Sequence, residues 1–383
     1  MQNCMQTLRS AMAAMPVFFA AAIFTSTGQT TQEDKELYRS RIDSAFWRND
    51  FLIQQDSSAR YTAVWVQKAA ILGAIMDDAD LQERFKQLDL QVEYSKALKQ
   101  AQKLDKNKEY ELAIETHLVS STIDLTHIAL HAMENARLYK SVADAEKAVE
   151  HLDLALENYK LTGSSQKMVD KHWAEEGLSW QWLRFYKGVC LRMAKKMVEA
   201  ENEYLSMIKL GWQEPTLFLE TADLQDKSDK REEALKTLAL GQDKLPGNAA
   251  IACALTKLYI KTDQLKKAQA TIKPFDNELG MNAEVAMTKA LVYEKKGDLK
   301  KADAILKAVY NSDKNEVIIQ TTYARYLMRK ATNAEKMDAE EFAQQAYTLI
   351  DKAIELSPSN EDLKEELASI KFRFPKVKKE EQD

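Results

Sequence analysis

The sequence contains little glycine, proline or cysteine. Its 383 residues include 10 glycines, 6 prolines and 3 cysteines, whereas alanine, leucine, lysine, glutamate and glutamine are abundant. So few glycines and prolines leave little turn chemistry for β-hairpins, and the abundant residue types are strong helix formers. The composition therefore predicts an all-α protein.

The three cysteines do not predict a disulfide or a lipid anchor. Cys4 lies too near the start of the chain to be the lipid-modified cysteine of a lipoprotein. Cys190 and Cys253 fall in helices that the repeat described below places two units apart. Their Cα atoms should then be farther apart than the roughly 7 Å that a disulfide tolerates. We expect both to be buried small apolar residues.

The sequence also has no large excess of charge of one sign and no catalytic signature. It carries 54 basic and 59 acidic residues, for a formal net charge of -5, and both signs are spread along the chain. This gives no electrostatic reason to expect nucleic acid or an anionic membrane as partner. No nucleophile elbow, phosphate-binding glycine loop or dinucleotide fingerprint occurs in it. We expect no enzyme activity and no cofactor.

Residues 1–28 have the three-part layout of a secretory signal peptide. Arg9 precedes an apolar run from Ala11 to Phe24, and small and polar residues follow. The run is shorter than the about 20 residues that a membrane-spanning helix needs. The layout resembles signal peptides of Bacteroidetes-type bacteria, in which a glutamine commonly follows the cut, here after Gly28. We expect an exported protein, periplasmic or secreted, without an integral membrane segment after cleavage; an uncleaved or merely disordered hydrophobic terminus is the alternative.

A helix-hairpin pattern recurs along the chain. In EVAMTKALVYEKKGDLKKADAILKAVYN, residues 284–311, one apolar helical face precedes Gly297 and another follows it. Neither half is apolar enough to fold alone, so repeated neighbours must cover both faces. The repeated alanine of the second helix stands at Ala113, Ala148, Ala200, Ala234, Ala268, Ala302 and Ala346, with spacings of 35, 52, 34, 34, 34 and 44 residues.

The first helix of each unit repeats a small residue as well. Such residues let paired helices approach to about 8–10 Å, which larger side chains would prevent. They stand at Ala101, Ala136, Gly188, Ala222, Thr256, Ala290 and Ala324. Large apolar residues follow the second-helix alanine at Leu152, Tyr204, Leu238, Ile272, Leu306 and Ile350, and His117 breaks this column. An irregular bundle with alanines placed by chance is the alternative.

The period of 34 residues, the two small columns and the closing prolines Pro246 and Pro358 resemble the tetratricopeptide repeat (TPR) family. The tryptophan of the family's first helix is not reproduced here. The resemblance implies a right-handed superhelical solenoid with capping helices, acting as a non-catalytic scaffold for other proteins. The predicted division is 1–28 signal peptide, 29–94 helical cap or degenerate repeat, 95–161 two divergent repeats, 162–180 inserted helix, 181–358 five repeats, and 359–383 capping helix with a charged tail.

Members of the TPR family commonly bind partners on the concave face, which the first helix of each unit lines. The resemblance places a mildly basic lining on this face, which suits an acidic or carboxylate-terminated peptide or helix of another protein. Solubility alone also explains such charges. The inward positions include Trp182, Phe185, Lys257, Lys261, Lys295, Arg325 and Arg329.

Two other functional interpretations remain open. The aromatic stretch 172–186 contains Trp173, Trp180, Trp182, Phe185 and Tyr186, a density that fits either a sugar-binding surface or a packed core. A carbohydrate-binding accessory protein is thus the alternative to the scaffold. His127 and His131 are four residues apart on one predicted helix, a spacing that binds zinc when a third ligand is present. We expect no metal, because a metal site needs three or four converging ligands; an enzyme that uses this histidine pair is the third interpretation.

Overall fold

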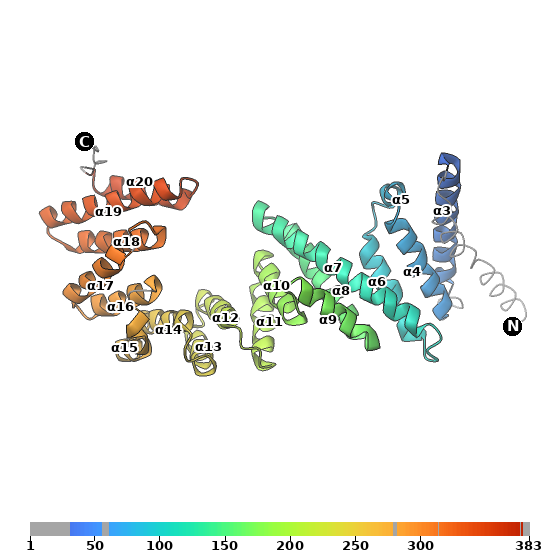
Figure 1. Ribbon diagram of the computed structural model, residues 1–383, viewed down its shortest axis with the longest axis horizontal. Coiled ribbons are helices and arrows are strands. Elements are labelled where there is room, and N and C mark those ends of the chain that lie inside the picture. Colours follow the sequence, from blue (N-terminus) through green and yellow to red (C-terminus); the bar gives the residue numbers. More distant parts are fainter. Residues whose placement is uncertain (1–30, 56–60, 279–281, 313, 376, 378–383) are drawn as a thin grey trace, which may run out of the picture. The chain divides into compact units, whose positions relative to one another are not determined.

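The computed structural model describes residues 31–55, 61–278, 282–312, 314–375 and 377. Within these ranges the chain forms helices α3 to α20 and two short 3-10 helices, without β-strands (Figure 1). The predicted all-α class is therefore confirmed for this part of the chain. The predicted signal peptide, residues 1–28, and Cys4 within it lie outside the described residues. Among the described helices, none combines the length and the apolar character that crossing a membrane requires.

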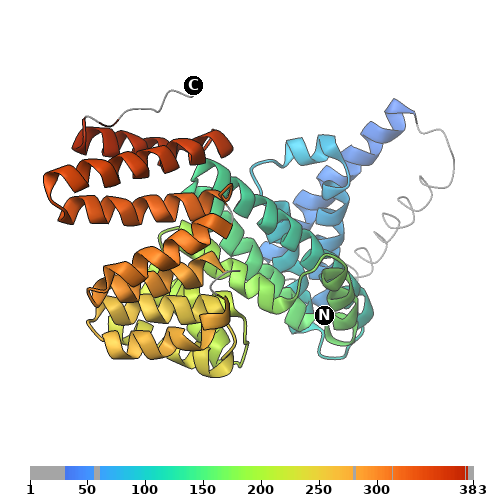
Figure 2. The same ribbon diagram turned by 60° about the vertical axis from the view of Figure 1, so that its left-hand side comes forward.

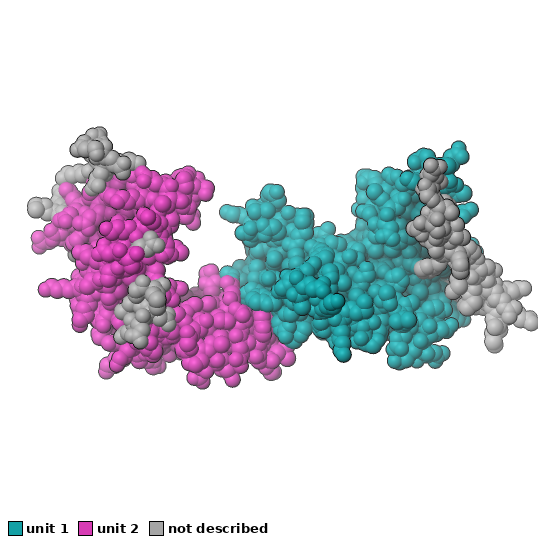
Figure 3. Space-filling model, viewed as in Figure 1, with its two compact units in different colours: residues 1–200 teal, residues 201–383 magenta. Residues whose placement is uncertain are grey.

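The chain divides into two compact units, residues 1–200 and 201–383 (Figure 3). The division falls inside helix α11 (Met197–Lys209). The described helices of the first unit are α3 (Gln32–Gln54), α4 (Thr62–Met76), α5 (Ala79–Arg84), α6 (Leu90–Leu104), α7 (Glu111–Tyr139), α8 (Val142–Leu161), α9 (Gln166–Glu175) and α10 (Trp180–Met193).

The second unit is built from helix hairpins. Its helices are α12 (Pro215–Lys227), α13 (Arg231–Lys244), α14 (Ala249–Lys261), α15 (Leu265–Ile272), α16 (Ala283–Lys295), α17 (Leu299–Ser312), α18 (Val317–Asn333), α19 (Lys336–Leu356) and α20 (Glu361–Arg373). The pairs α12/α13, α14/α15, α16/α17 and α18/α19 pack within themselves, and each first helix also contacts the next first helix (Figure 2). Helix α20 covers α19.

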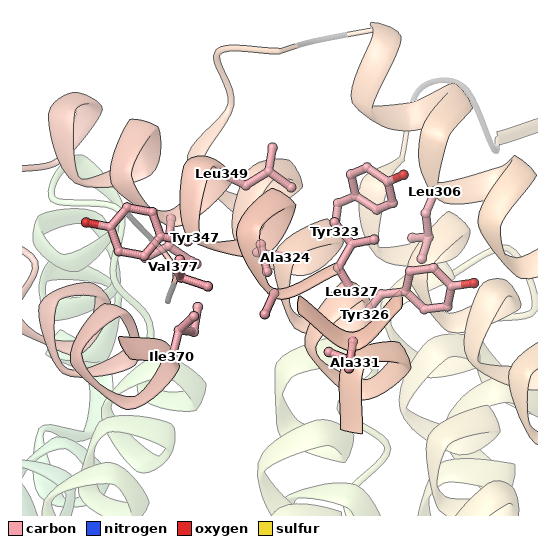
Figure 4. Packing of buried hydrophobic residues seen from close by; sticks show 14 of the residues in the cluster. Leu306, Tyr323, Ala324, Tyr326, Leu327, Ala331, Tyr347, Leu349, Ile370 and Val377 are labelled. Atoms are coloured by element: carbon pink, nitrogen blue, oxygen red, sulfur yellow. The ribbon is translucent and has the colours of Figure 1, made fainter. Parts of the chain in front are cut away.

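The repeated small residues are buried as the packing argument requires. Ala148, Ala200, Ala234, Ala268, Ala302 and Ala346 are each 0% exposed. The first-helix column from Ala101 to Ala324 is buried at all seven positions. Figure 4 shows Ala324 in the core cluster of the second unit, with Leu306 of α17 on one side and Leu349 of α19 on the other. The small side chains at these positions let the helices of each hairpin approach closely.

The backbone repeats the same period independently of the alanines. Four residues at intervals of 34 have positive φ angles of 62°, 59°, 55° and 82°: Lys195, Asp229, Asp263 and Gly297. After each of them, the next N–H donates to the carbonyl five residues earlier, which closes the first helix as in a Schellman motif. These bonds are Lys196 to Leu191, Lys230 to Gln225, Gln264 to Tyr259 and Asp298 to Tyr293. The hairpins therefore share one turn, although only the last uses glycine.

Residues 95–161 differ from the predicted pair of repeats. Helix α7 runs without a break for 29 residues and replaces both the second helix of one predicted repeat and the first helix of the next. The prediction that Ala113 is a packing residue is wrong, because Ala113 is exposed while Ile114 and Leu118 are buried. The segment from Glu111 to Tyr139 contains no glycine or proline that would end a helix between the two predicted repeats.

The N-terminal segment, left open as a helical cap or a degenerate repeat, contains α3, α4, α5 and the start of α6. Helix α4 packs against both α3 and α6. The Nε atom of Arg39 on α3 donates to the Oδ2 atom of Asp78, the N-cap of α5, at 2.9 Å. These helices extend the first unit beyond the residues that carry the repeat.

Helix α9 lies in the predicted insertion, residues 162–180, and packs against other helices of the first unit near both of its ends. Near its start, Ser164 Oγ and Ser165 Oγ donate to the carboxylate of Glu115 on α7, at 2.8 and 3.1 Å. Farther along, Val169 and Trp173 are buried in the core cluster formed with α7 and α8. The insertion is thus a packed helix with a fixed position on α7.

A buried histidine links α8 to the start of α6. The side chain of His151 is 1% exposed; its Nδ1 lies 2.8 Å from the Lys147 carbonyl and its Nε2 lies 3.2 Å from Asp89 Oδ2. Burial alone would lower the pKa of His151, but the contacts with Asp89 and the Lys147 carbonyl outweigh burial and raise it, while the Lys147 ammonium acts in the opposite direction. The same contact with His151 lowers the pKa of Asp89.

This pair makes the stability of the first unit depend on pH. Because the pKa of His151 is raised by folding, its contribution is complete below about pH 6.5 and is lost as the pH rises through the folded-state pKa. We expect the urea midpoint of the wild type to fall as the pH rises from about 6.5 through the folded-state pKa of His151. In His151→Gln the urea midpoint should depend less on pH over the same range. His131→Gln, which alters an exposed histidine, is the control. Equal pH profiles for His151→Gln and the wild type would contradict the assignment.

Candidate functional site

Five of the predicted partner-binding residues lie on consecutive first helices of the second unit. Lys257 and Lys261 are on α14, Lys295 ends α16, and Arg325 and Arg329 are on α18. We call the solvent-exposed side of α12, α14, α16 and α18 the first-helix face. All five cations retain exposed side chains, since Lys295 is exposed and the other four are 40 to 61% exposed.

Four of these cations pair with carboxylates of the neighbouring helix. Lys261 Nζ lies 2.7 Å from Asp226 on α12. The remaining contacts are each 2.9 Å long: Lys257 with Glu284 on α16, Arg329 with Glu294 on α16, and Arg325 with Glu366 on α20. The predicted basic lining is therefore a surface of mixed charge, because a carboxylate of a neighbouring helix stands opposite each of these four cations.

The ion pairs of the first-helix face remain open to exchange. Hydrogen bonding to Lys261 holds the pKa of Asp226 below its ordinary value, and the fork to Glu366 raises the pKa of Arg325. The carboxylate of Asp226 is thus ionised at neutral pH. Such half-exposed pairs contribute little net stability in water. A carboxylate of a partner can replace one of them at low cost, and the displaced group is then hydrated.

Lys295 is the exception on this face. No ion pair to Lys295 occurs among the residues that the structure describes, and its side chain is exposed at the end of α16. Its ammonium is therefore the cation of this set that a partner can reach without displacing a carboxylate of the first-helix face.

The two predicted aromatic site residues lie in the first unit, on α10. Trp182 is half-buried and Phe185 is buried. Their ring centroids are 5.7 Å apart at 90°, and Trp182 stacks on Tyr186 at 6.0 Å. Phe185 therefore packs in the interior, and only part of the predicted aromatic surface is available to a partner.

Elsewhere in the aromatic stretch the core interpretation holds. Trp173 is 1% exposed and its ring lies 4.9 Å from that of Tyr159. A sugar-binding platform needs aromatic faces in contact with solvent. Trp173 cannot supply one, because the core of the first unit covers its ring.

The His127 and His131 pair does not form a shared site. His131 contacts Asn135 on its own helix at 3.3 Å. His127 Nε2 instead faces Glu176, the C-cap residue directly after α9, at 3.0 Å. The partner of His127 is thus Glu176, which lies in the predicted insertion, where no residue of the repeat pattern was identified.

A cavity of about 590 Å³ opens in the first unit between α5, the start of α6 and α8. Its lining includes Glu83, Lys86, Asp89 and Lys147, but no serine, cysteine or histidine among the described residues. Asp89 already caps α6 by accepting from the Val92 N–H and contacts His151. One of the two carboxylates that line the cavity, that of Asp89, is therefore engaged in structural contacts.

No family model matches the sequence, and no curated protein matches it. Solved structures resemble it in part. TTC0263, a thermophilic TPR protein of Thermus thermophilus, is 20% identical over 50% of this chain and 99% of its own, with a TM-score of 0.41. A tetratricopeptide repeat protein from Parabacteroides merdae is 14% identical over 64% of this chain and 99% of its own, with a TM-score of 0.40. Yeast Tom70 is 13% identical over 96% of this chain and 86% of its own, with a TM-score of 0.42.

These are distant likenesses, and the chain's own repeat defines its fold. The buried small residues and the left-handed turns recur with the same period of 34 residues, and the helices pair into hairpins. The chain has an all-α repeat fold of TPR-like hairpins.

Proposed function

We propose that the protein is a non-catalytic scaffold of the bacterial cell envelope that binds an acidic peptide or helix of another protein in a concave groove along the first-helix face. One observation carries the proposal. Ion pairs cross between α12 and α14, α14 and α16, α16 and α18, and α18 and α20, so the side chains of successive helices form one continuous charged surface.

The chemistry of this surface favours a peptide over a small substrate. Its half-exposed cations recur on three successive first helices, a spacing that suits an extended or helical segment with several carboxylates. Location in the envelope is part of the proposal, and it rests on the signal-peptide layout of residues 1–28. The burial of Trp173 and Phe185 weakens the carbohydrate-binding alternative.

The test compares two triple variants with equal loss of charge. Lys257→Gln, Lys295→Gln and Arg329→Gln together remove three of the five cations of the first-helix face, including Lys295, whereas Lys300→Gln, Lys301→Gln and Lys307→Gln neutralise exposed lysines of the second helix α17. The full chain is used to capture partners from envelope extract, and the purified partner is then titrated by calorimetry. We expect the first triple variant to bind at least about tenfold more weakly, because charge-assisted contacts contribute about 1.5–3 kcal/mol each.

The control should bind the purified partner as the wild type does. Equal binding by the first-helix variant and the wild type would rule out this face as the binding site. Failure of the wild type to retain any protein from the extract would count against the scaffold itself. Circular dichroism of each variant shows whether the helices remain folded.

A further inference from the structure

Three side chains of the first unit direct metal-ligand atoms to one point. His127 lies in the middle of α7, while His172 is in the last turn of α9 and Glu176, four residues later, is its C-cap. Glu176 Oε1 is 3.0 Å from His127 Nε2 and 3.4 Å from His172 Nε2. All three ligand atoms lie within 4.8 Å of one another. The cluster is therefore close enough to share one ion.

Two of the three distances between these ligand atoms are close to those of tetrahedral coordination. Zinc binds imidazole nitrogen and carboxylate oxygen at about 2.0–2.2 Å, so two ligand atoms on one tetrahedral ion are about 3.3–3.5 Å apart. The distance between His172 and Glu176 falls in this range, and that between His127 and Glu176 is slightly shorter. The three side chains are 36 to 48% exposed, which leaves them room to rotate.

The backbone already holds the two helices in place. Trp173, which follows His172, is buried in the core, and Val169 on the preceding turn is also buried. Glu115 of α7 accepts hydrogen bonds from both serines at the start of α9. An ion would therefore bind to a site whose backbone is fixed by packing, which keeps the cost of ordering the ligands small.

A ring nitrogen in the cluster lacks a hydrogen-bond partner. His172 Nε2 is almost inaccessible to solvent and makes no hydrogen bond, although Glu176 Oε1 lies 3.4 Å away. Leaving a polar atom unsatisfied in this way costs free energy, and a bound cation removes that cost. The set of two imidazoles and one carboxylate suits zinc-like ions, whereas magnesium and calcium prefer oxygen ligands.

We propose that His127, His172 and Glu176 bind one Zn²⁺ ion per chain. Three protein ligands leave a fourth coordination position open to water or to a group of a bound partner. The ion would connect the middle of α7 to the end of α9, and would thereby stabilise the inserted helix. This site is separate from the first-helix face, which belongs to the second unit.

The test uses the full chain without an affinity tag. We expect isothermal titration with ZnCl₂ to give one ion per chain, and the melting temperature to rise with zinc because the ion binds the folded state. Each of the three ligand variants should weaken zinc binding by at least about 100-fold, which is more than the loss of a residue that only hydrogen-bonds to a ligand causes. These variants are His127→Gln, His172→Gln and Glu176→Gln. Co²⁺ should give the visible absorption bands of a tetrahedral site in the wild type.

His131→Gln is the matched control, since His131 lies on α7 one turn from His127 and is exposed. It should bind zinc as tightly as the wild type. Absence of stoichiometric zinc, undiminished binding by the three ligand variants, or equal loss in His131→Gln would overturn the proposal. Melting without zinc shows that each glutamine variant is folded.

Discussion

Replacing Trp173 with alanine is expected to lower the free energy of unfolding by about 3–5 kcal/mol, the usual cost of removing a buried tryptophan. The side chain is 1% exposed and packs in the cluster that joins α7, α8, α9 and α10. Its removal leaves a cavity that the fixed helices around it cannot close. Urea denaturation followed by circular dichroism measures the loss.

Trp47→Ala is the control for residue type, because Trp47 is 61% exposed on α3 in the same unit. It should cost less than about 1 kcal/mol, as surface substitutions usually do. If Trp173→Ala were as stable as Trp47→Ala, the core assignment of Trp173 would be wrong. Quenching of the tryptophan fluorescence of the wild-type protein by an oligosaccharide would then favour the carbohydrate-binding interpretation.

The sequence predicted the hairpins well where each unit has its own turn. From Gly188 to Ala346 both small columns are buried, because close helix crossings admit little else at those positions. The prediction failed at Ala113, where spacing alone suggested a unit boundary inside α7. The left-handed turns at Asp229 and Asp263 were also missed, since only glycine was taken as a turn signal.

The candidate site was less predictable, because it depends on contacts between distant residues. The helical face of Lys257 follows from periodicity, but its pairing with Glu284, 27 residues away, depends on how two hairpins stack. The contact between Arg325 and Glu366 spans 41 residues. His127 was matched with His131 on its own helix, whereas folding brings it to Glu176, 49 residues away. Sequence periodicity predicts which face of a helix a side chain lies on, but its partner on another helix follows only from how the helices pack.

Replacing Ala302 with leucine is expected to lower the free energy of unfolding by about 1–3 kcal/mol through overpacking. Ala302 is fully buried on α17, in a cluster that includes Ala290 of α16 and Ala324 of α18. A leucine there pushes the helix axes apart in its own hairpin and in the next one. The urea midpoint of the variant, compared with that of the wild type, measures this effect.

The same helix supplies matched controls for Ala302→Leu. Ala304 and Ala308 are exposed on α17, so Ala304→Leu and Ala308→Leu add the same side chain without a packing clash. Both should leave the urea midpoint nearly unchanged, because leucine is also a strong helix former. Equal losses at Ala302 and Ala304 would mean that helix propensity, not the close crossing of helices, explains the result. The repeated alanines would then lose their structural role, and with it the argument that successive first helices form one binding surface.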